Sequence, residues 1–122
     1  MRLEPLFNDA PDNGLGVLFF DLDRFKEYND RYGHSGGDRA LTAFASLLAN
    51  CTPAHGFSCR YGGEEFLTVL GAANLDESVE FARTVRNGLA RQEGLLEPLT
   101  VSAGVAMYDT SMATRGEILA AA

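Results

Sequence analysis

One stretch organises the rest of the chain: residues 59–70, with the sequence CRYGGEEFLTVL. A short alternating segment from Phe57 to Tyr61 meets Gly62 and Gly63 and then an apolar run, a pattern typical of two antiparallel strands joined by a two-residue primed turn. Glycine tolerates the positive φ of such a turn and has no side chain, so a ligand phosphate could approach this backbone.

Two glutamates follow the glycine pair. Glu64 and Glu65 occupy adjacent strand positions, so their side chains point to opposite faces of the sheet and only one of them can readily serve a given site. The segment alone also fits an ordinary hairpin with solvated glutamates. A second acidic cluster elsewhere in the chain is what favours a functional site.

That second cluster lies at the end of an apolar strand. Leu15 to Phe20 is a continuous apolar run, typical of a strand covered on both faces, and Asp21 and Asp23 follow it. If this strand and the hairpin are neighbours, Asp21, Asp23 and Glu64 gather at one edge of the sheet. Carboxylates so close raise one another's pKa unless a cation joins them, and oxygen ligands of this kind suit Mg²⁺ or Mn²⁺.

Hydrophobic periodicity indicates the other elements. Phe25, Tyr28 and Tyr32 share one face of a short helix that ends at Gly33, and residues 35–38 begin the next helix. Residues 74–77 cap another long helix, residues 99–107 alternate as a last strand, and residues 2–8 and 114–122 also have helical patterns. This order predicts an α+β fold of ferredoxin-like, palm type, with helices packed on one face of a sheet containing antiparallel strands.

Composition excludes several classes of protein. The 122 residues are 46% hydrophobic, which suits one domain with a core that needs no disulfide. A net charge of −7 leaves no basic surface for a nucleic-acid polymer or an anionic membrane. No run approaches the roughly 18 apolar residues of a membrane span, and the N-terminus is not a signal peptide, so we expect a cytoplasmic protein.

A zinc site is an alternative use of the two cysteines. Cys51, His55 and Cys59 recur at every fourth position, and His34 is a conceivable fourth ligand. This spacing differs from the usual zinc-finger patterns, and a strand cysteine such as Cys59 is more commonly a small buried thiol. The pattern therefore favours structural cysteines over zinc.

Three separated motifs give the chain a family resemblance. They are DLDRFKEYND at residues 21–30, GHSGGD at residues 33–38 and RYGGEEF at residues 60–66. In this order they resemble the GGDEF family of diguanylate cyclases over roughly residues 16–108. The resemblance implies a nucleotide-cyclase-like domain occupying residues 1–122, which condenses two GTP into cyclic di-GMP and pyrophosphate in bacterial second-messenger signalling.

The resemblance also implies a role for each acidic residue. The metal ligands would be Asp21, the backbone carbonyl of Leu22, and Glu64, holding Mg²⁺ or Mn²⁺ against the triphosphate. Two such ions about 3.5–4 Å apart can activate an attacking hydroxyl and hold the α-phosphate. Asp23 or Glu65 would add an electrostatic or base contribution.

Substrate recognition is implied at other residues. Guanine needs acceptors for its ring N–H and exocyclic amine, and a donor for its edge oxygen or ring nitrogen; by the resemblance, Asp38 and Asn29 supply them. A site of this kind rejects analogues by factors on the order of 10⁴. The amides around Arg24 and Phe25, at a helix start, would bind phosphate oxygens. Asp38 also fits a simple helix-start carboxylate, and the two roles are compatible.

The sequence departs from the family pattern in two places. Many members carry an Arg-x-x-Asp product-inhibition site, and here residues 53–56 are PAHG, so we expect no feedback inhibition through it. The chain also lacks the family's N-terminal Asp-x-Leu-Thr-Gly-Leu-x-Asn-Arg segment and its C-terminal helix, which carries a lysine and an arginine for the triphosphate. We expect a domain incomplete at both termini, with weak or no activity by itself.

Three kinds of function stay open at this level. The first is the catalytic domain of a diguanylate cyclase, which works as a homodimer because one subunit cannot close the ring, and which is fused to a sensor or receiver domain in the parent protein. The second is a non-catalytic GTP-binding regulatory module that controls a partner domain. The third is a structural or dimerisation domain with solvated acids.

Overall fold

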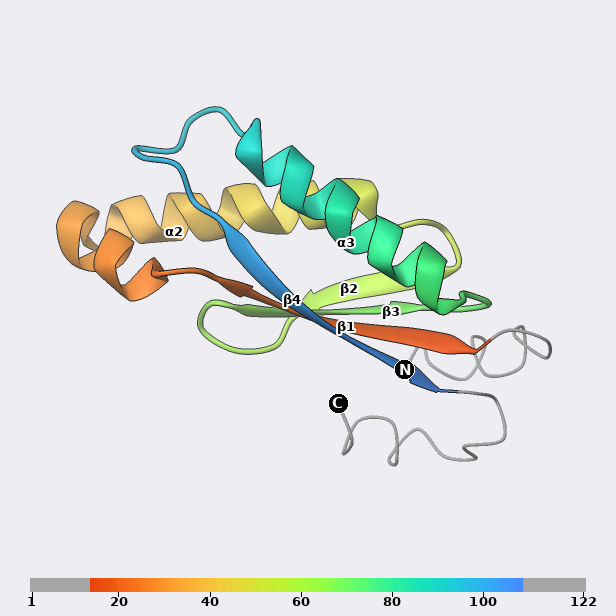
Figure 1. The fold of residues 1–122 in the computed structure, drawn as a ribbon. Coiled ribbons are helices and arrows are strands. Elements are labelled where there is room, and N and C mark those ends of the chain that lie inside the picture. The colour runs from red at the N-terminus through yellow and green to blue at the C-terminus, as the bar shows by residue number, and fades with distance from the viewer. Residues whose placement is uncertain (1–13, 109–122) are drawn as a thin grey trace.

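A four-stranded sheet with two helices on one face makes up residues 14–108, the part of the chain that the computed structural model describes (Figure 1). The elements are β1 (Leu15–Leu22), α2 (Phe25–Cys51), β2 (Gly56–Arg60), β3 (Glu65–Leu70), α3 (Leu75–Ala90) and β4 (Val101–Tyr108). The helical patterns at residues 2–8 and 114–122 lie outside the described residues.

The strands are arranged in the order β2-β3-β1-β4, and each neighbouring pair is antiparallel. This βαββαβ arrangement is ferredoxin-like, so the predicted α+β fold is confirmed. β1 lies inside the sheet, between β3 and β4, and ends beside the tip of the β2–β3 hairpin. The topology therefore brings two acidic motifs, far apart in the sequence, to the same edge.

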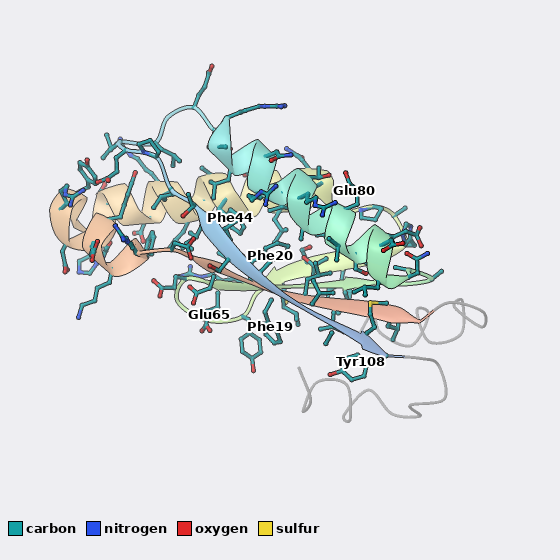
Figure 2. The ribbon with its side chains drawn as sticks, in the orientation of Figure 1. Phe19, Phe20, Phe44, Glu65, Glu80 and Tyr108 are labelled. Carbon is teal, nitrogen blue, oxygen red and sulfur yellow. The ribbon has the colours of Figure 1, made fainter. Side chains whose placement is uncertain are left out.

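β1 is buried on both faces, as its apolar run predicts. Phe20 is fully buried and packs edge-on against Phe44 of α2 and Phe81 of α3. Figure 2 shows Phe20 and Phe19 pointing to opposite faces of the sheet. The face away from the helices carries a second buried cluster, formed by Leu15, Val17, Leu67 and Val69.

α2 consists of two helical segments that join at Gly33. The backbone of Gly33 is not helical (φ 77°, ψ 172°), which confirms the predicted end of a short helix there. This conformation is essentially restricted to glycine. Because the kink interrupts the helix, the longer segment that follows does not by itself set the direction of residues 25–32.

The hairpin loop differs from the predicted two-residue turn. β2 ends at Arg60 and β3 begins at Glu65, so residues 61–64 form the loop. Neither Gly62 nor Gly63 has positive φ, so the expected two-residue primed turn at these glycines is wrong. The physical reason is the longer loop, which the N–H groups of Tyr61 and Gly62 close through bonds to the Glu65 carbonyl (2.8 and 3.1 Å).

α3 begins with the capping interaction that its sequence predicts. The Asn74 side chain accepts a hydrogen bond from the Glu77 N–H (2.8 Å), and the Glu77 carboxylate accepts one from the Asn74 N–H (3.1 Å). Both bonds use amides that the helix itself leaves without partners. Neither α2 nor α3, the helices of residues 14–108, is long and apolar enough to cross a membrane.

We expect Gly33→Ala to destabilise the domain by about 1–3 kcal/mol, because alanine strains the backbone that glycine adopts. Nothing lies within 4 Å of an added Cβ, so crowding does not contribute. Gly104→Ala is a matched control, because its Cβ also meets nothing within 4 Å and its φ is not positive. Urea denaturation measures both variants, and equal stabilities would contradict a strained kink.

Candidate functional site

The acidic ends of β1 and of the hairpin meet, as the sequence predicts. Asp21 lies directly opposite Glu65 in the β1–β3 register, and the Leu22 N–H donates to the Glu64 carbonyl oxygen at 3.3 Å. Asp21 and Glu65 are exposed, whereas Glu64 is half-buried. Figure 2 shows Glu65 at the end of the sheet that carries the hairpin loop.

These carboxylates repel one another. Burial raises the pKa of Glu64, and the negative charges of Asp21 and Glu65 raise it further. Like charges placed directly opposite in an antiparallel pair are destabilising. The ion pairs within residues 14–108, Arg31–Glu97 and Arg83–Glu80, do not involve this group. The edge therefore has the negative charge and the oxygen ligands that attract a cation.

The backbone carbonyl oxygen of Leu22 also lies at this acidic edge. A strand residue directs its N–H and C=O to the same neighbour, so the Leu22 carbonyl faces the hairpin loop as its N–H does. In the described part of the chain, no three His, Cys, Asp or Glu side chains gather closely enough to hold a metal. A divalent ion here would bind the Asp21 and Glu64 carboxylates and the Leu22 carbonyl, a donor set of oxygens alone.

Asp23 does not join this group. Its two carboxylate oxygens accept hydrogen bonds from the hydroxyls of Ser102 (2.6 Å) and Thr100 (2.7 Å), and its N–H donates to the Thr100 carbonyl (2.9 Å). The Ser102 and Thr100 hydroxyls lower the pKa of Asp23. Asp23 lies at the same edge of the sheet, but its charge is not among those that raise the pKa of Glu64, because the Ser102 and Thr100 hydroxyls hold its side chain toward β4.

Across the kink of α2, Asn29 lies against Gly37, the residue before Asp38. The side-chain oxygen of Asn29 lies so close to Gly37 that a Cβ there would approach it to less than 3.0 Å. Asp38 is the next residue along the helix. The Asn29 amide nitrogen lies 3.2 Å from Nδ1 of His34. The two residues that the resemblance gives to guanine therefore lie on the two segments of α2, one on each side of the kink.

A cavity of about 560 Å³ opens between the second segment of α2 and the hairpin. Asp38 and Leu41 line it from the helix, and Arg60 and Phe66 line it from the hairpin. Small-molecule sites in proteins usually occupy about 300–1,000 Å³. Asp38 thus stands in the wall of a cavity large enough for a ligand.

The start of α2 offers backbone amides. Arg24, the residue before the helix, adopts the left-handed conformation (φ 55°, ψ 31°), and its side chain makes no capping hydrogen bond. The first N–H groups of a helix, here from Phe25 onward, have no partners within the helix, and helix N-termini attract anions. This turn is therefore suited to phosphate oxygens.

The hairpin loop is held by a residue that the sequence did not single out. The Arg60 guanidinium donates from Nε to the Gly62 carbonyl (3.0 Å) and from a terminal nitrogen to the Gly63 carbonyl (2.6 Å). An added Cβ on Gly62 would meet the Glu65 carboxylate at 2.5 Å, whereas one on Gly63 would meet nothing within 4 Å. The open side of the loop is therefore at Gly63.

The alternative zinc ligands do not gather in the described residues. Cys51 is half-buried at the end of α2, and burial raises the pKa of its thiol. Cys59 is exposed and not the buried thiol expected, because β2 is at the edge of the sheet. Cys59 instead lines the cavity beside Asp38.

Comparison with known proteins agrees with this geometry. Residues 1–122 match the family described as "Diguanylate cyclase, GGDEF domain". The chain is 42% identical over 94 residues to diguanylate cyclase DgcM of Escherichia coli, covering 76% of this chain and 23% of that protein. It is 31% identical over 109 residues to diguanylate cyclase A of Treponema denticola, covering 86% and 29%. The chain therefore spans less than a third of these relatives.

Solved structures share the fold. The active GGEEF domain of a diguanylate cyclase from Vibrio cholerae superposes with a TM-score of 0.71 at 33% identity, covering 76% of this chain and 61% of that one. The GGDEF domain of TpbB from Pseudomonas aeruginosa superposes with a TM-score of 0.77 at 32% identity, covering 88% of this chain and 71% of that one. With a family match over its whole length and the same fold as these domains, the chain belongs to the GGDEF family of diguanylate cyclase domains.

Proposed function

We propose that this domain, within its parent protein, condenses two molecules of GTP into cyclic di-GMP and pyrophosphate. The observation that carries the proposal is the meeting of Asp21 and Glu64 at one edge of the sheet, supported by family membership. The cavity that Asp38 lines would provide room for the base. Because GTP is a cytoplasmic nucleotide, the reaction would take place in the cytoplasm.

Asp21, the Leu22 carbonyl and Glu64 are the proposed ligands of Mg²⁺ or Mn²⁺. Their fit rests on the repulsion among Asp21, Glu64 and Glu65, which a divalent cation would relieve. When bound, the ion lowers the pKa of an attacking hydroxyl and neutralises charge on the phosphates. Glu65, directly opposite Asp21, is proposed to support this site electrostatically.

The same geometry supports a proposed set of substrate contacts. Asp38 would accept hydrogen bonds from the guanine ring N–H and amine, and Asn29 would donate to the opposite edge of the base. Phosphate oxygens would lie against the amides at Arg24 and Phe25, at the start of α2. At the loop, Gly62 already uses its N–H for Glu65, so a phosphate would approach the open side at Gly63.

The proposed reaction needs two copies of the domain. The 3′-hydroxyl oxygen of each GTP attacks the α-phosphorus of the other, its proton is lost, and the bond to pyrophosphate breaks. Two such steps close the ring and release two pyrophosphates. One site holds one nucleotide, so a homodimer must bring two sites face to face. A sensor or receiver domain in the parent protein would control this approach.

Product formation is the direct test. The parent protein, incubated with GTP and Mg²⁺, is expected to release cyclic di-GMP, detected by chromatography. Glu64→Ala should reduce the rate by on the order of 10²-fold or more, since even indirect changes at metal sites cost about 10–100-fold. Glu80→Ala, an exposed change on α3, is the control. GTP binding without product would identify a regulatory module, and no GTP binding would identify a structural domain.

Metal binding gives a second prediction. In the absence of metal, Glu64→Gln should stabilise the domain by about 0.2–1 kcal/mol at neutral pH, because it removes one of three repelling charges. The same change should abolish the stabilisation by Mg²⁺, which for the unaltered protein is about 2.7 kcal/mol at 100 times the dissociation constant. Thermal denaturation with and without Mg²⁺ measures both effects. An unchanged Mg²⁺ effect in this variant would exclude Glu64 as a ligand.

Asp23 is proposed to fix the end of β1 to β4. Asp23→Ala should lower stability by about 1–2 kcal/mol at neutral pH, because two hydroxyls lose a charged acceptor. Since hydrogen bonds lower the folded-state pKa of Asp23, its stabilisation exists above the ordinary aspartate pKa of 3.8 and is lost as the pH falls through the folded value. Denaturation measured from pH 7 down to pH 2 tests this. A pH-independent loss would contradict it, as would full additivity with Ser102→Ala.

A further inference from the structure

The segment that carries Asn29 is held from outside its own helix. Gly33 interrupts α2, so residues 25–32 need other contacts to fix their direction. Tyr28 supplies one: its side chain is buried (3% exposed), and its hydroxyl accepts a hydrogen bond from the Leu96 N–H at 3.0 Å. These contacts hold the backbone around Asn29 in place. The orientation of its side-chain amide depends on the groups next to the amide.

Both ends of the Asn29 amide have neighbours. Its nitrogen lies 3.2 Å from Nδ1 of His34. An amide nitrogen only donates, so this bond requires Nδ1 of a neutral His34 to accept, with the ring hydrogen on Nε2. The amide oxygen lies against the bare backbone of Gly37, where an added Cβ would also come within 3.1 Å of the Asn29 Cγ. In the structure, the amide nitrogen faces His34 and the amide oxygen faces Gly37.

This orientation has a consequence for base recognition. The amide nitrogen carries two hydrogens, and the bond to His34 uses one of them. The other is available to an acceptor such as the O6 or N7 atom of guanine. A rotated amide would instead turn an oxygen toward those acceptors, and the contact would become repulsive. The close approach at Gly37 also leaves no room for a side chain beside the amide.

We propose that His34 and Gly37 set the guanine specificity of the site by fixing the orientation of the Asn29 amide. The inference rests on the proposed function, because it assumes that this site binds GTP. His34 acts as a positioning residue through the hydrogen bond to Asn29. Gly37 acts through the absence of a side chain. Neither residue needs to touch the base.

The test compares four nucleotides bound to the parent protein with Mg²⁺: GTP, ATP, ITP and 6-thio-GTP. ITP lacks the exocyclic amine that Asp38 would bind, and 6-thio-GTP replaces O6 with sulfur, a weak acceptor. We expect His34→Ala to weaken GTP binding by about five- to tenfold, the effect of one lost hydrogen bond. Its preference for GTP over 6-thio-GTP should fall toward one, while its preference for GTP over ITP is retained.

Companion variants separate positioning from general damage. His34→Asn restores an acceptor and should recover most of the 6-thio-GTP discrimination. Gly37→Ala should lose the discrimination between GTP and 6-thio-GTP, as His34→Ala does. Gly88→Ala is the matched control. Gly88 lies on α3, away from Asn29, and its added Cβ would also crowd a side chain, that of Leu47, at 2.6 Å. His34 is exposed, so its variants should fold, and thermal denaturation checks this.

Three results would overturn either this inference or the proposed function. If the unaltered protein prefers GTP to ATP and to 6-thio-GTP, but His34→Ala keeps both preferences, the inference about His34 and Gly37 is wrong and the proposed function stands. Equal loss of discrimination against ITP and 6-thio-GTP would also reject it, because that result indicates a general distortion. If the unaltered protein does not distinguish GTP from ATP, the proposed function itself fails.

Discussion

The antiparallel register of β1 with β3 is the constraint on which the site depends. It places Asp21 opposite Glu65 and brings the Leu22 N–H to the Glu64 carbonyl. Because side chains alternate along a strand, a slip of one residue would move each carboxylate to the other face of the sheet. The packing of Phe20 against Phe44 of α2 and Phe81 of α3 opposes such a slip, because another residue would then have to fill this place in the core. The core thus fixes the acidic edge.

The rest of the candidate site is less rigidly attached. Asn29 lies on a short helical segment beyond a glycine kink, and contacts with the loop between α3 and β4 hold that segment. Arg31 of the segment also pairs with Glu97 of that loop. The acidic edge and the residues proposed for base recognition therefore depend on different parts of the structure. A change in the loop could alter base recognition and leave the acidic edge intact.

The repulsion at the acidic edge and the hydrogen bonds of Asp23 show two ways of managing carboxylates at a strand end. Asp23 is stabilised as an anion by two hydroxyls, which lower its pKa. Glu64 is destabilised as an anion by burial and by two neighbouring charges, which raise its pKa. The first arrangement is complete without a ligand, and the second gains from a cation. This contrast supports a structural role for Asp23 and a binding role for Glu64.

The sequence alone determined the order of the elements, the end of a short helix at Gly33, the capping of α3 and the meeting of Asp21 with Glu64. These features follow from local periodicity, turn residues and a topology with few alternatives. Only the tertiary structure decided the partners of Asp23, the clamp of Arg60 on its loop, the exposure of Cys59 and the contacts of the Asn29 amide. The Asp23 partners lie 77 and 79 residues away, and no local pattern encodes a contact over that separation. Side-chain hydrogen bonds of this kind form only after the backbone has brought distant segments together, so periodicity can predict the edge but not which groups bind there.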